Sequence, residues 1–407
     1  MTQENNLDNY RWLVSAEARP WLDMIARSDR SLITLSQSIR REIGIARTHM
    51  LIAQLELRRR AKVKFAQAEH MFFTRALLEQ ATDEAIAEYK ASRFPQGRHL
   101  ADLCCGIGGD LLGLAGRGAV TAVDRDPVAV LLAEANCQAV GRNAVTCVVA
   151  DVAECQVDDF AAWHLDPDRR AKTTRTTRVE YFEPGPEIID RLRSLNPQGA
   201  VKLAPATAAP ESWAREAELE WIGSRGECRQ QVAWFGELAC HPGQCSATIL
   251  APSSPAPHRI HGRPDVVPPP ADRLGRYIFE PHAAVLAAGL VGVVAEQHGL
   301  AAVSPGIVYL TGDRLVVHPA LSCFEITEVM PFDVKTVRAA LRARGIGHLE
   351  VKKRGVRVTP EQVRNKMQPR GDGQATLLLT KLGKKVKAIL ARRVTLAPEQ
   401  SDESREV

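Results

Sequence analysis

The sequence lacks any long hydrophobic run. Its longest uncharged apolar stretch is Ala283 to Ala295, 13 residues, whereas a helix needs about 20 to cross a bilayer. The first ten residues are polar and acidic, without the basic and apolar regions of a secretory signal. We therefore expect a soluble, cytoplasmic protein that makes no use of a membrane.

Aromatic residues are also scarce, at 5% of the chain. The 45% of hydrophobic and 25% of charged residues are still the proportions of an ordinary globular protein, which excludes a disordered, collagen-like or coiled-coil chain. The nine cysteines are an odd number, and without a secretion signal they predict reduced thiols and no disulfide framework. At about 150 residues per domain, 407 residues predict two or three domains.

Charge is distributed unevenly along the chain. The total is +5, but residues 1–95 carry +3, residues 96–331 carry −8, residues 332–395 carry +13 and residues 396–407 carry −3. An asymmetry of this size favours an anionic partner for the basic segment. A basic face that is merely solvated is the alternative, and charge alone does not separate the two.

Residues 1–95 predict a helical N-terminal region, because apolar residues recur at spacings of three and four and no proline occurs between Pro20 and Pro95. In residues 96–270, short apolar strands alternate with helical stretches, which is typical of an α/β fold with a Rossmann-like doubly wound sheet. The predicted strands are residues 99–103, 119–123, 146–150, 162–165 and 200–203.

The remaining elements divide the C-terminal half. Residues 231–238 and 246–250 predict an antiparallel hairpin, and 251–270 an exposed linker. Residues 271–331 form a connecting segment with one helix at 283–297. Residues 332–395 predict a small α+β domain, and 396–407 a tail. Within that domain we expect helices at 334–343 and 360–366 and strands at 349–352, 375–380 and 385–391.

A glycine-rich turn follows the first strand of the predicted sheet. It reads Asp102-Leu103-Cys104-Cys105-Gly106-Ile107-Gly108-Gly109, and a helix is expected to begin near Asp110. Glycines let the backbone approach a ligand without a Cβ atom in the way, and a helix N-terminus offers free N–H groups. Asp124 and Asp151 end the next two strands. Asp102, Asp124 and Asp151 therefore all fall on the carboxyl edge of the sheet, where doubly wound folds bind ligands.

These acidic residues favour one kind of ligand. Asp124 can accept hydrogen bonds from two ribose hydroxyls, and Asp151 can read an exocyclic amine. The turn lacks the later glycine that dinucleotide-binding turns use. With Asp102 just before the turn, S-adenosylmethionine, which carries a sulfonium and an ammonium group, suits the site better than NAD.

The motifs resemble those of class I S-adenosylmethionine-dependent methyltransferases. More narrowly, residues 60–395 resemble bacterial methyltransferases that carry a C-terminal THUMP-like domain. The matching segments also include Phe73-Thr74-Arg75, Glu79-Gln80-Ala81-Thr82, Val123-Asp124-Arg125-Asp126-Pro127, Asp166-Pro167-Asp168-Arg169-Arg170, Gly289-Leu290-Val291 and Glu350-Val351-Lys352-Lys353-Arg354-Gly355. The resemblance implies that Asp102 lies near the methionine amino group, that Asp124 holds the ribose and that Asp151 lies by the adenine. Turn residues complete the predicted cofactor site: Cys104, Gly106, Gly108 and Gly109.

The fourth predicted strand ends at the expected methyl-transfer position. Related nucleic-acid N-methyltransferases have Asp/Asn-Pro-Pro-aromatic there, whereas this chain has Asp166-Pro167-Asp168-Arg169-Arg170, closer to the Asp-Pro-x-Arg form of some RNA methyltransferases. We predict that Asp166, in its turn with Pro167, orients or deprotonates the acceptor. Arg169 and Arg170 are predicted to hold a phosphate. The alternative is a strand-ending turn with solvated arginines.

One set of residues approaches a zinc-finger pattern. Cys240 and Cys245 are followed by His258 and His261. The two residues between the histidines are fewer than the usual three to five, so we predict no metal site.

The composition of the basic C-terminal domain indicates what kind of partner it binds. It contains a single aromatic residue, Phe332, so backbone contact with a structured RNA is favoured over base stacking. The predicted RNA contacts are Lys352, Lys353, Arg354 and Arg357. THUMP-like domains are associated with RNA, so the resemblance implies the same partner that the charge favours.

The leading prediction is therefore an S-adenosylmethionine-dependent methyltransferase that modifies a nucleobase in structured RNA, either tRNA or rRNA. The alternatives are an RNA-binding protein whose methyltransferase fold is inactive, and a methyltransferase of small molecules or proteins. No obligate protein partner is evident.

Overall fold

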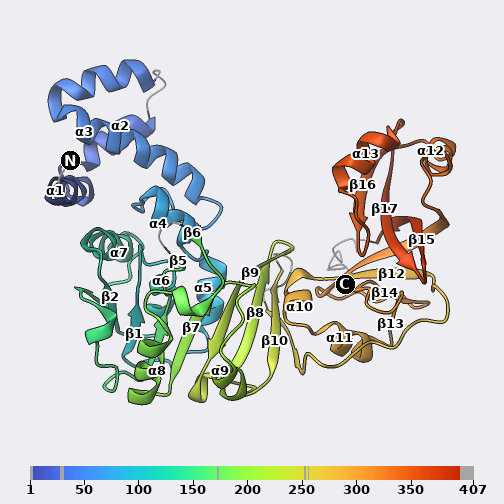
Figure 1. Ribbon diagram of the computed structural model, residues 1–407. Coiled ribbons are helices and arrows are strands. Elements are labelled where there is room, and N and C mark those ends of the chain that lie inside the picture. Colours follow the sequence, from blue (N-terminus) through green and yellow to red (C-terminus); the bar gives the residue numbers. More distant parts are fainter. Residues whose placement is uncertain (1–2, 28–31, 172–173, 252–253, 255, 395–407) are drawn as a thin grey trace, which may run out of the picture. The chain divides into compact units, whose positions relative to one another are not determined.

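The computed structural model describes residues 3–27, 32–171, 174–251, 254 and 256–394, and Figure 1 shows its helices and strands. The chain divides into two compact units. The first holds residues 1–218 and 230–243, and the second holds residues 219–229 and 244–407. The domain boundaries predicted after residues 95, 270 and 331 stay predictions.

The first unit begins with helices, as predicted. In the described residues these are α1 (Gln3–Val14), α2 (Arg19–Arg27), α3 (Leu32–Ala61), α4 (Arg75–Gln80) and α5 (Glu84–Ala91). The helix α3 is kinked at Gly44, whose φ of 82° lies in the left-handed region that favours glycine. Apolar residues of α1, α2 and α3, among them Leu13, Ile25 and Leu51, bury one another in a common core.

A parallel sheet forms the centre of the first unit (Figure 1). Its strands are β1 (Leu100–Leu103), β2 (Val120–Asp124), β3 (Val145–Val149), β4 (Ala162–Leu165) and β7 (Gly199–Leu203). Their order is β7-β4-β1-β2-β3, and each neighbouring pair is parallel. This confirms the five predicted strands and the doubly wound fold. The chain reverses its direction of travel across the sheet between β3 and β4, which opens a crevice at the carboxyl ends of β1 and β4.

Helices and short segments complete the first unit. They are α6 (Leu111–Leu114), α7 (Pro127–Ala139), α8 (Pro186–Leu195), α9 (Glu211–Glu216), the 3-10 turns η1 (Val152–Glu154), η2 (Val179–Tyr181) and η3 (Gly236–Leu238), and the antiparallel pair β5 (Arg170–Ala171) and β6 (Thr174–Arg175). The helix α7 starts where Asp126 accepts a hydrogen bond from the Val128 N–H and Pro127 occupies the first turn. The helix predicted near Asp110 is the single turn α6.

The predicted hairpin between residues 231–238 and 246–250 is wrong. The strand β10 (Cys245–Leu250) pairs in parallel with β8 (Glu218–Ser224), which the sequence pattern did not predict, and antiparallel with β11 (His258–Gly262). The strand β9 (Glu227–Trp234) instead pairs antiparallel with β7 through residues 231–234. The chain reverses between β8 and β9 at Arg225 and Gly226, with φ of 54° and 80°. The predicted linker 251–270 therefore contains a strand, β11.

The second unit also contains a seven-stranded sheet of order β13-β14-β12-β15-β18-β17-β16. Its elements are β12 (Tyr277–Pro281), α10 (Ala283–Ala287), α11 (Val291–His298), β13 (Ala301–Ala302), β14 (Leu310–Gly312), β15 (Leu321–Pro331), α12 (Val334–Ala343), β16 (Ile346–Lys353), α13 (Pro360–Met367), β17 (Gly373–Leu382) and β18 (Lys385–Arg393). The five elements predicted within 332–395 are confirmed. The single helix predicted at 283–297 is two helices, because Gly289 between them has a φ of 70°. No helix of the described ranges is both long and apolar enough to cross a membrane.

One buried side chain joins three parts of the first unit. Asn136 on α7 is fully buried. Its Oδ1 accepts from the Phe72 N–H at 2.7 Å, and its Nδ2 donates to the carbonyls of Phe72 at 3.1 Å and Ile107 at 2.9 Å. Asn136 thereby ties the segment before α4 and the glycine-rich turn to the helix that follows β2.

We expect the substitution Asn136→Leu to lower the free energy of unfolding by about 2 kcal/mol or more, because it leaves buried backbone groups of Phe72 and Ile107 without partners. Urea unfolding followed by circular dichroism measures this change. Gln138→Leu, on an exposed position of the same helix, is the matched control and should change stability little. Equal stabilities of the two variants would contradict the assignment.

Candidate active site

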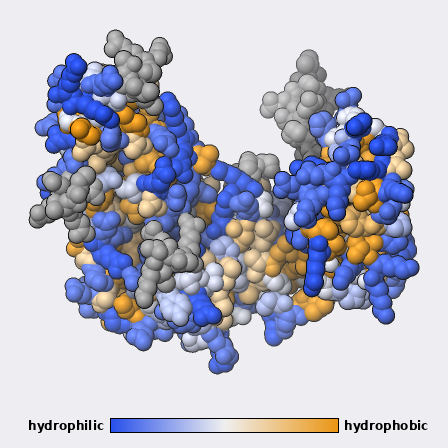
Figure 2. Space-filling model, turned by 45° about the horizontal axis from the view of Figure 1, so that its top comes forward, coloured by the Kyte–Doolittle hydropathy of each residue, from blue (hydrophilic) through white to orange (hydrophobic). Residues whose placement is uncertain are grey.

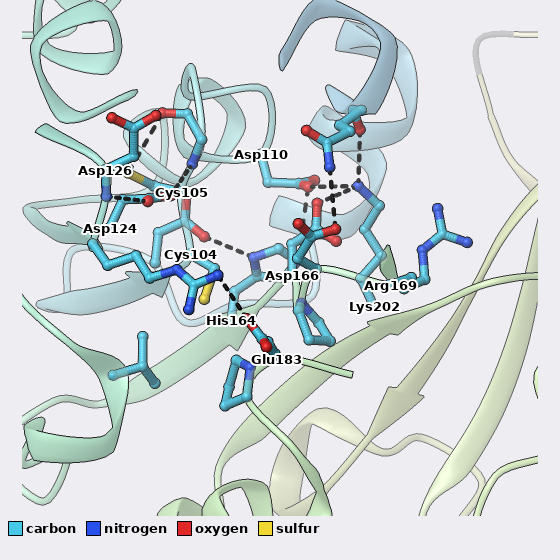
Figure 3. A pocket seen from close by; sticks show the side chains of 18 of the residues that line it. Cys104, Cys105, Asp110, Asp124, Asp126, His164, Asp166, Arg169, Glu183 and Lys202 are labelled. Carbon is cyan, nitrogen blue, oxygen red and sulfur yellow. Dashed lines mark hydrogen bonds and ion pairs between the residues drawn. The ribbon is translucent and has the colours of Figure 1, made fainter. Parts of the chain in front are cut away.

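A cavity of about 510 Å³ lies at the carboxyl ends of β1, β2 and β4 (Figure 3). The predicted site residues in its lining are Asp102, Cys104, Gly106, Gly109, Asp124, Asp151, Asp166, Pro167 and Arg169. Gly108 is not part of the lining. Arg170 lies on β5, and its side chain falls outside the described part of the structure. The fold thus brings residues from four separate motifs to one cavity, while their individual roles stay predictions.

The glycines of the glycine-rich turn are required for two different reasons, backbone conformation and close packing. Gly106 and Gly108 have φ of 54° and 89°, a conformation that side chains disfavour. Gly109 is needed for packing, because a Cβ atom there would lie 2.9 Å from the Thr82 backbone nitrogen. Gly109 therefore allows the segment between α4 and α5 to close against the turn, and Gly106 faces the cavity.

Asp102 is buried beneath the turn and holds His164. Its Oδ1 lies 2.7 Å from the Nδ1 of His164, on the neighbouring strand β4, and both side chains are 1% exposed. Its Oδ2 is buried without a hydrogen-bond partner among the described residues. Burial raises the pKa of Asp102, and the hydrogen bond from His164 opposes that shift. An unpartnered carboxylate oxygen beside a cavity favours a cationic or hydrogen-bond-donating ligand.

Asp124 and Asp151 stand at the other side of the cavity. The Asp124 carboxylate accepts from the Gly106 N–H and the Asp126 N–H, each at 2.9 Å. It therefore fixes the glycine-rich turn as well as facing the cavity. Burial raises the pKa of Asp124, against the effect of these two hydrogen bonds. Asp151 is exposed and caps η1 by accepting from the Ala153 N–H at 2.8 Å.

The structure also shows buried charges that sequence reasoning missed. Asp110 forms an ion pair with Lys90 of α5 at 2.5 Å and accepts from the Thr82 hydroxyl at 2.7 Å. Lys202 of β7 lies 3.9 Å from Asp110 and 2.5 Å from Asp166. Figure 3 shows Lys202 extending toward both carboxylates. Burial acts to raise the pKa of Asp110, but Lys90, His164 and Lys202 outweigh it and the pKa is lowered.

One signal in the sequence marks such residues. His164 and Lys202 each interrupt an apolar strand near its carboxyl end. An ionisable residue at a fully buried strand position needs a charged partner. The sequence does not identify that partner, because Lys90, Asp110 and Lys202 are far apart along the chain.

The loop after β4 is joined to the segment before α8. Asp168 and Glu183 exchange two backbone hydrogen bonds, of 2.8 and 2.9 Å. The Glu183 side chain pairs with Arg125 at 2.6 Å, and Glu183, Pro184 and Gly185 border the cavity. Asp168 also lies 3.4 Å from the Gln80 amide nitrogen. These contacts fix the turn that holds Asp166 and Pro167.

The cavity contains neither an aromatic platform nor a reactive thiolate in the described lining. His164 is the one aromatic ring that lines it, and that ring is held by Asp102. Burial raises the pKa of Cys104 and of Cys105 well above the ordinary thiol value. A protonated thiol is a poor nucleophile. Chemistry through a cysteine adduct is therefore disfavoured, and direct transfer to an oriented acceptor is favoured.

None of the four zinc-like residues is part of the cavity lining. Cys245 is on β10 and His258 and His261 are on β11, while the Cys240 N–H donates to Glu218. Within the described ranges, no three His, Cys, Asp or Glu side chains are grouped so as to hold a metal ion.

The predicted RNA-contacting residues differ in their surroundings. Lys352 and Arg354 pair with Glu280 of β12 at 2.6 and 3.1 Å. Lys353 and Arg357 are exposed, and no ion pair involves them in the described part of the chain. Two of the four predicted cations therefore have their charge matched inside the protein.

Comparison with known proteins identifies the class. An uncharacterized S-adenosylmethionine-dependent methyltransferase of Mycobacterium tuberculosis is 33% identical over 352 residues, which cover 83% of this chain and 94% of that protein. Its counterpart in a second strain gives the same values. The crystal structure of a Porphyromonas gingivalis protein assigned as a methyltransferase has 19% identity and a TM-score of 0.78, over 97% of this chain and 100% of that one. Residues 321–393 match a family model described as THUMP domain-like.

The chain belongs to the S-adenosylmethionine-dependent methyltransferases. It has the class I Rossmann-like fold, carries a THUMP-like domain and uses S-adenosylmethionine, which supplies the methyl group when bound. The cavity fits this donor on its own geometry. The unpartnered oxygen of Asp102 suits an ammonium group, and the carboxylate of Asp124 beside Gly106 suits a pair of hydroxyls.

We expect Asp124→Ala to weaken S-adenosylmethionine binding by about tenfold to 100-fold, the loss of one or two hydrogen bonds to a charged group. Isothermal titration calorimetry measures the dissociation constant directly. Asp158→Ala removes an exposed carboxylate outside the cavity lining and should bind as the unaltered protein does. Asp124→Ala binding with unchanged affinity would remove the ribose role from this residue.

Proposed function

We propose that this methyltransferase modifies a nucleobase in structured RNA, of the tRNA or rRNA class. The observation that carries the proposal is the C-terminal module: residues 321–393 match a THUMP-like domain, and residues 332–395 carry a net charge of +13. A polyanion of regular backbone geometry is the partner that such a surface fits. Figure 2 shows hydrophilic side chains gathered on this module, beside hydrophobic ones.

Four of the exposed cations lie at one end of the module. The strands β16 and β17 are parallel, with Lys353 opposite Leu379, so their carboxyl ends coincide. Lys353 is the last residue of β16 and Arg357 follows that strand, while exposed Lys381 lies near the end of β17 and exposed Lys384 follows it. This cluster, Lys353, Arg357, Lys381 and Lys384, supports backbone contact with RNA. Lys352 and Arg354 are better explained as internal partners of Glu280.

The proposal is tested with total RNA from cells that lack the protein, incubated with S-adenosylmethionine carrying a labelled methyl group. We expect label in RNA, and a loss of about 100-fold in rate for Asp166→Asn, because acceptor orientation and proton removal contribute that much or more. RNA binding without incorporation would favour the inactive fold. Incorporation into proteins or small molecules, and none into RNA, would favour the other alternative.

The double substitution Lys353→Glu and Arg357→Glu should raise the KM for RNA by about tenfold at 100 mM salt and flatten its salt dependence, because two phosphate contacts are lost. Initial rates at several salt concentrations measure both effects. Arg314→Glu, an exposed cation of the same unit outside the module, is the control and should leave KM unchanged. An identical KM for the double variant would argue against this cluster.

A further inference from the structure

We propose that Lys202 is a positioning residue for methyl transfer, which holds one carboxylate oxygen of Asp166 so that the second oxygen receives the proton of an acceptor N–H group. This inference rests on the proposed function, because it takes Asp166 as the group that meets the acceptor. Lys202 also lines the cavity, and the role assigned to it is to act through Asp166.

The sheet places the two residues side by side. The parallel strands β4 and β7 pair Leu165 with Val201, so the next residue of each, Asp166 and Lys202, emerges at the same level of the carboxyl edge. The Lys202 Nζ lies 2.5 Å from Oδ2 of Asp166. No hydrogen bond to Oδ1 of Asp166 is found among the described residues. One oxygen is thus occupied, and the other remains for the acceptor.

The ammonium group of Lys202 has contacts besides the one with Asp166. Its side chain is 8% exposed, whereas that of Asp166 is 26% exposed and borders the cavity. The Nζ also lies 3.5 Å from the Gln80 carbonyl and 3.9 Å from Asp110. Asp110 is itself fixed by Lys90. Lys202 therefore presents its ammonium group to Asp166 from a largely buried position that two further contacts hold, as a positioning group requires.

The charges around Lys202 keep it protonated. The charged or titratable groups that face it are Asp166 and His164 of the β4 end, Asp110 before α6, Lys90 of α5 and Arg169 of the following loop. Burial acts to lower the pKa of Lys202, but the carboxylates of Asp166 and Asp110 outweigh it and the pKa is raised. The ammonium of Lys202 is therefore available to hold Oδ2 of Asp166.

An ionised Asp166 is needed for the proton balance of the reaction. The acceptor nitrogen forms a bond to the methyl carbon while the carbon–sulfur bond breaks and its electron pair remains on sulfur. The nitrogen then carries a positive charge and a proton, and that proton passes to Oδ1 of Asp166, giving a neutral carboxylic acid that returns it to water. A carboxylate beside an ammonium is a weak base, which suffices because the N–H becomes acidic as the new bond forms.

The test uses Lys202→Met, Asp166→Asn and the double variant, with RNA from cells lacking the protein as the methyl acceptor. For Lys202→Met we expect kcat to fall by about tenfold or more with little change in the KM for RNA, and the acid limb of its pH profile to move to higher pH. The double variant should be no slower than Asp166→Asn, since Lys202 acts through Asp166. Multiplicative losses in the double variant would overturn the inference.

A matched control separates positioning from folding. Arg93→Met removes another buried cation from its carboxylate partner, Glu218 at 2.6 Å, away from the cavity. It should lower stability without moving the pH profile. If Arg93→Met shifts the acid limb as much as Lys202→Met does, the shift reports general destabilisation and the inference fails.

A second measurement is independent of the acceptor. In protein labelled with carbon-13 at aspartate carboxyls, the signal that disappears in Asp166→Asn identifies Asp166. That signal should move in Lys202→Met and keep its position in Arg93→Met, and an unmoved signal in Lys202→Met would overturn the inference whatever the acceptor. A moved signal in a protein that methylates no RNA would instead refute the proposed function alone.

Discussion

The buried carboxylate of Asp110 is the constraint on which the catalytic end of the sheet depends. It follows the glycine-rich turn and contacts Lys90 of α5 and Thr82 before that helix, and it lies near His164 of β4 and Lys202 of β7. A buried charge is tolerated only when it is paired. The ion pairs therefore fix the relative placement of two strands, one helix and the turn, and the cavity takes its shape from them.

The same network adjoins an acidic group that has an oxygen to spare. Oδ2 of Asp102 is buried without a hydrogen-bond partner among the described residues, and Asp102 lines the cavity. A buried carboxylate oxygen in this state favours a cationic or hydrogen-bond-donating ligand, and S-adenosylmethionine carries a sulfonium and an ammonium group. The ion pairs that stabilise this end of the sheet therefore surround the cavity in which that oxygen lies.

The parallel strands of the first unit were predictable because each one corresponds to a short local pattern in the sequence. Short apolar runs of four or five residues, separated by helical stretches, identified β1, β2, β3, β4 and β7, and the acidic residues at their ends identified the edge that binds ligand. The strand β8 was missed because it mixes Glu218 and Glu220 with apolar residues. Both glutamates are buried, and their partners come from other segments: Arg93 pairs with Glu218, and the Thr248 hydroxyl donates to Glu220. Lys90 and Lys202 were missed for the same reason. Pattern reveals a polar residue in an apolar run, but only the fold supplies the residue that neutralises it.

In the basic module, the net charge of the segment does not show which of its cations are paired within the protein. Glu280 lies on β12, outside the segment whose net charge is +13, yet it pairs with Lys352 and Arg354. Successive residues of a strand point to opposite faces, so Lys353 at the end of β16 is exposed where Lys352 is half-buried. Alternation predicts that neighbouring lysines differ; it does not tell which of them faces the protein. The place of Glu280 in the folded unit shows which do, because Lys352 and Arg354, which it pairs with, are the half-buried ones.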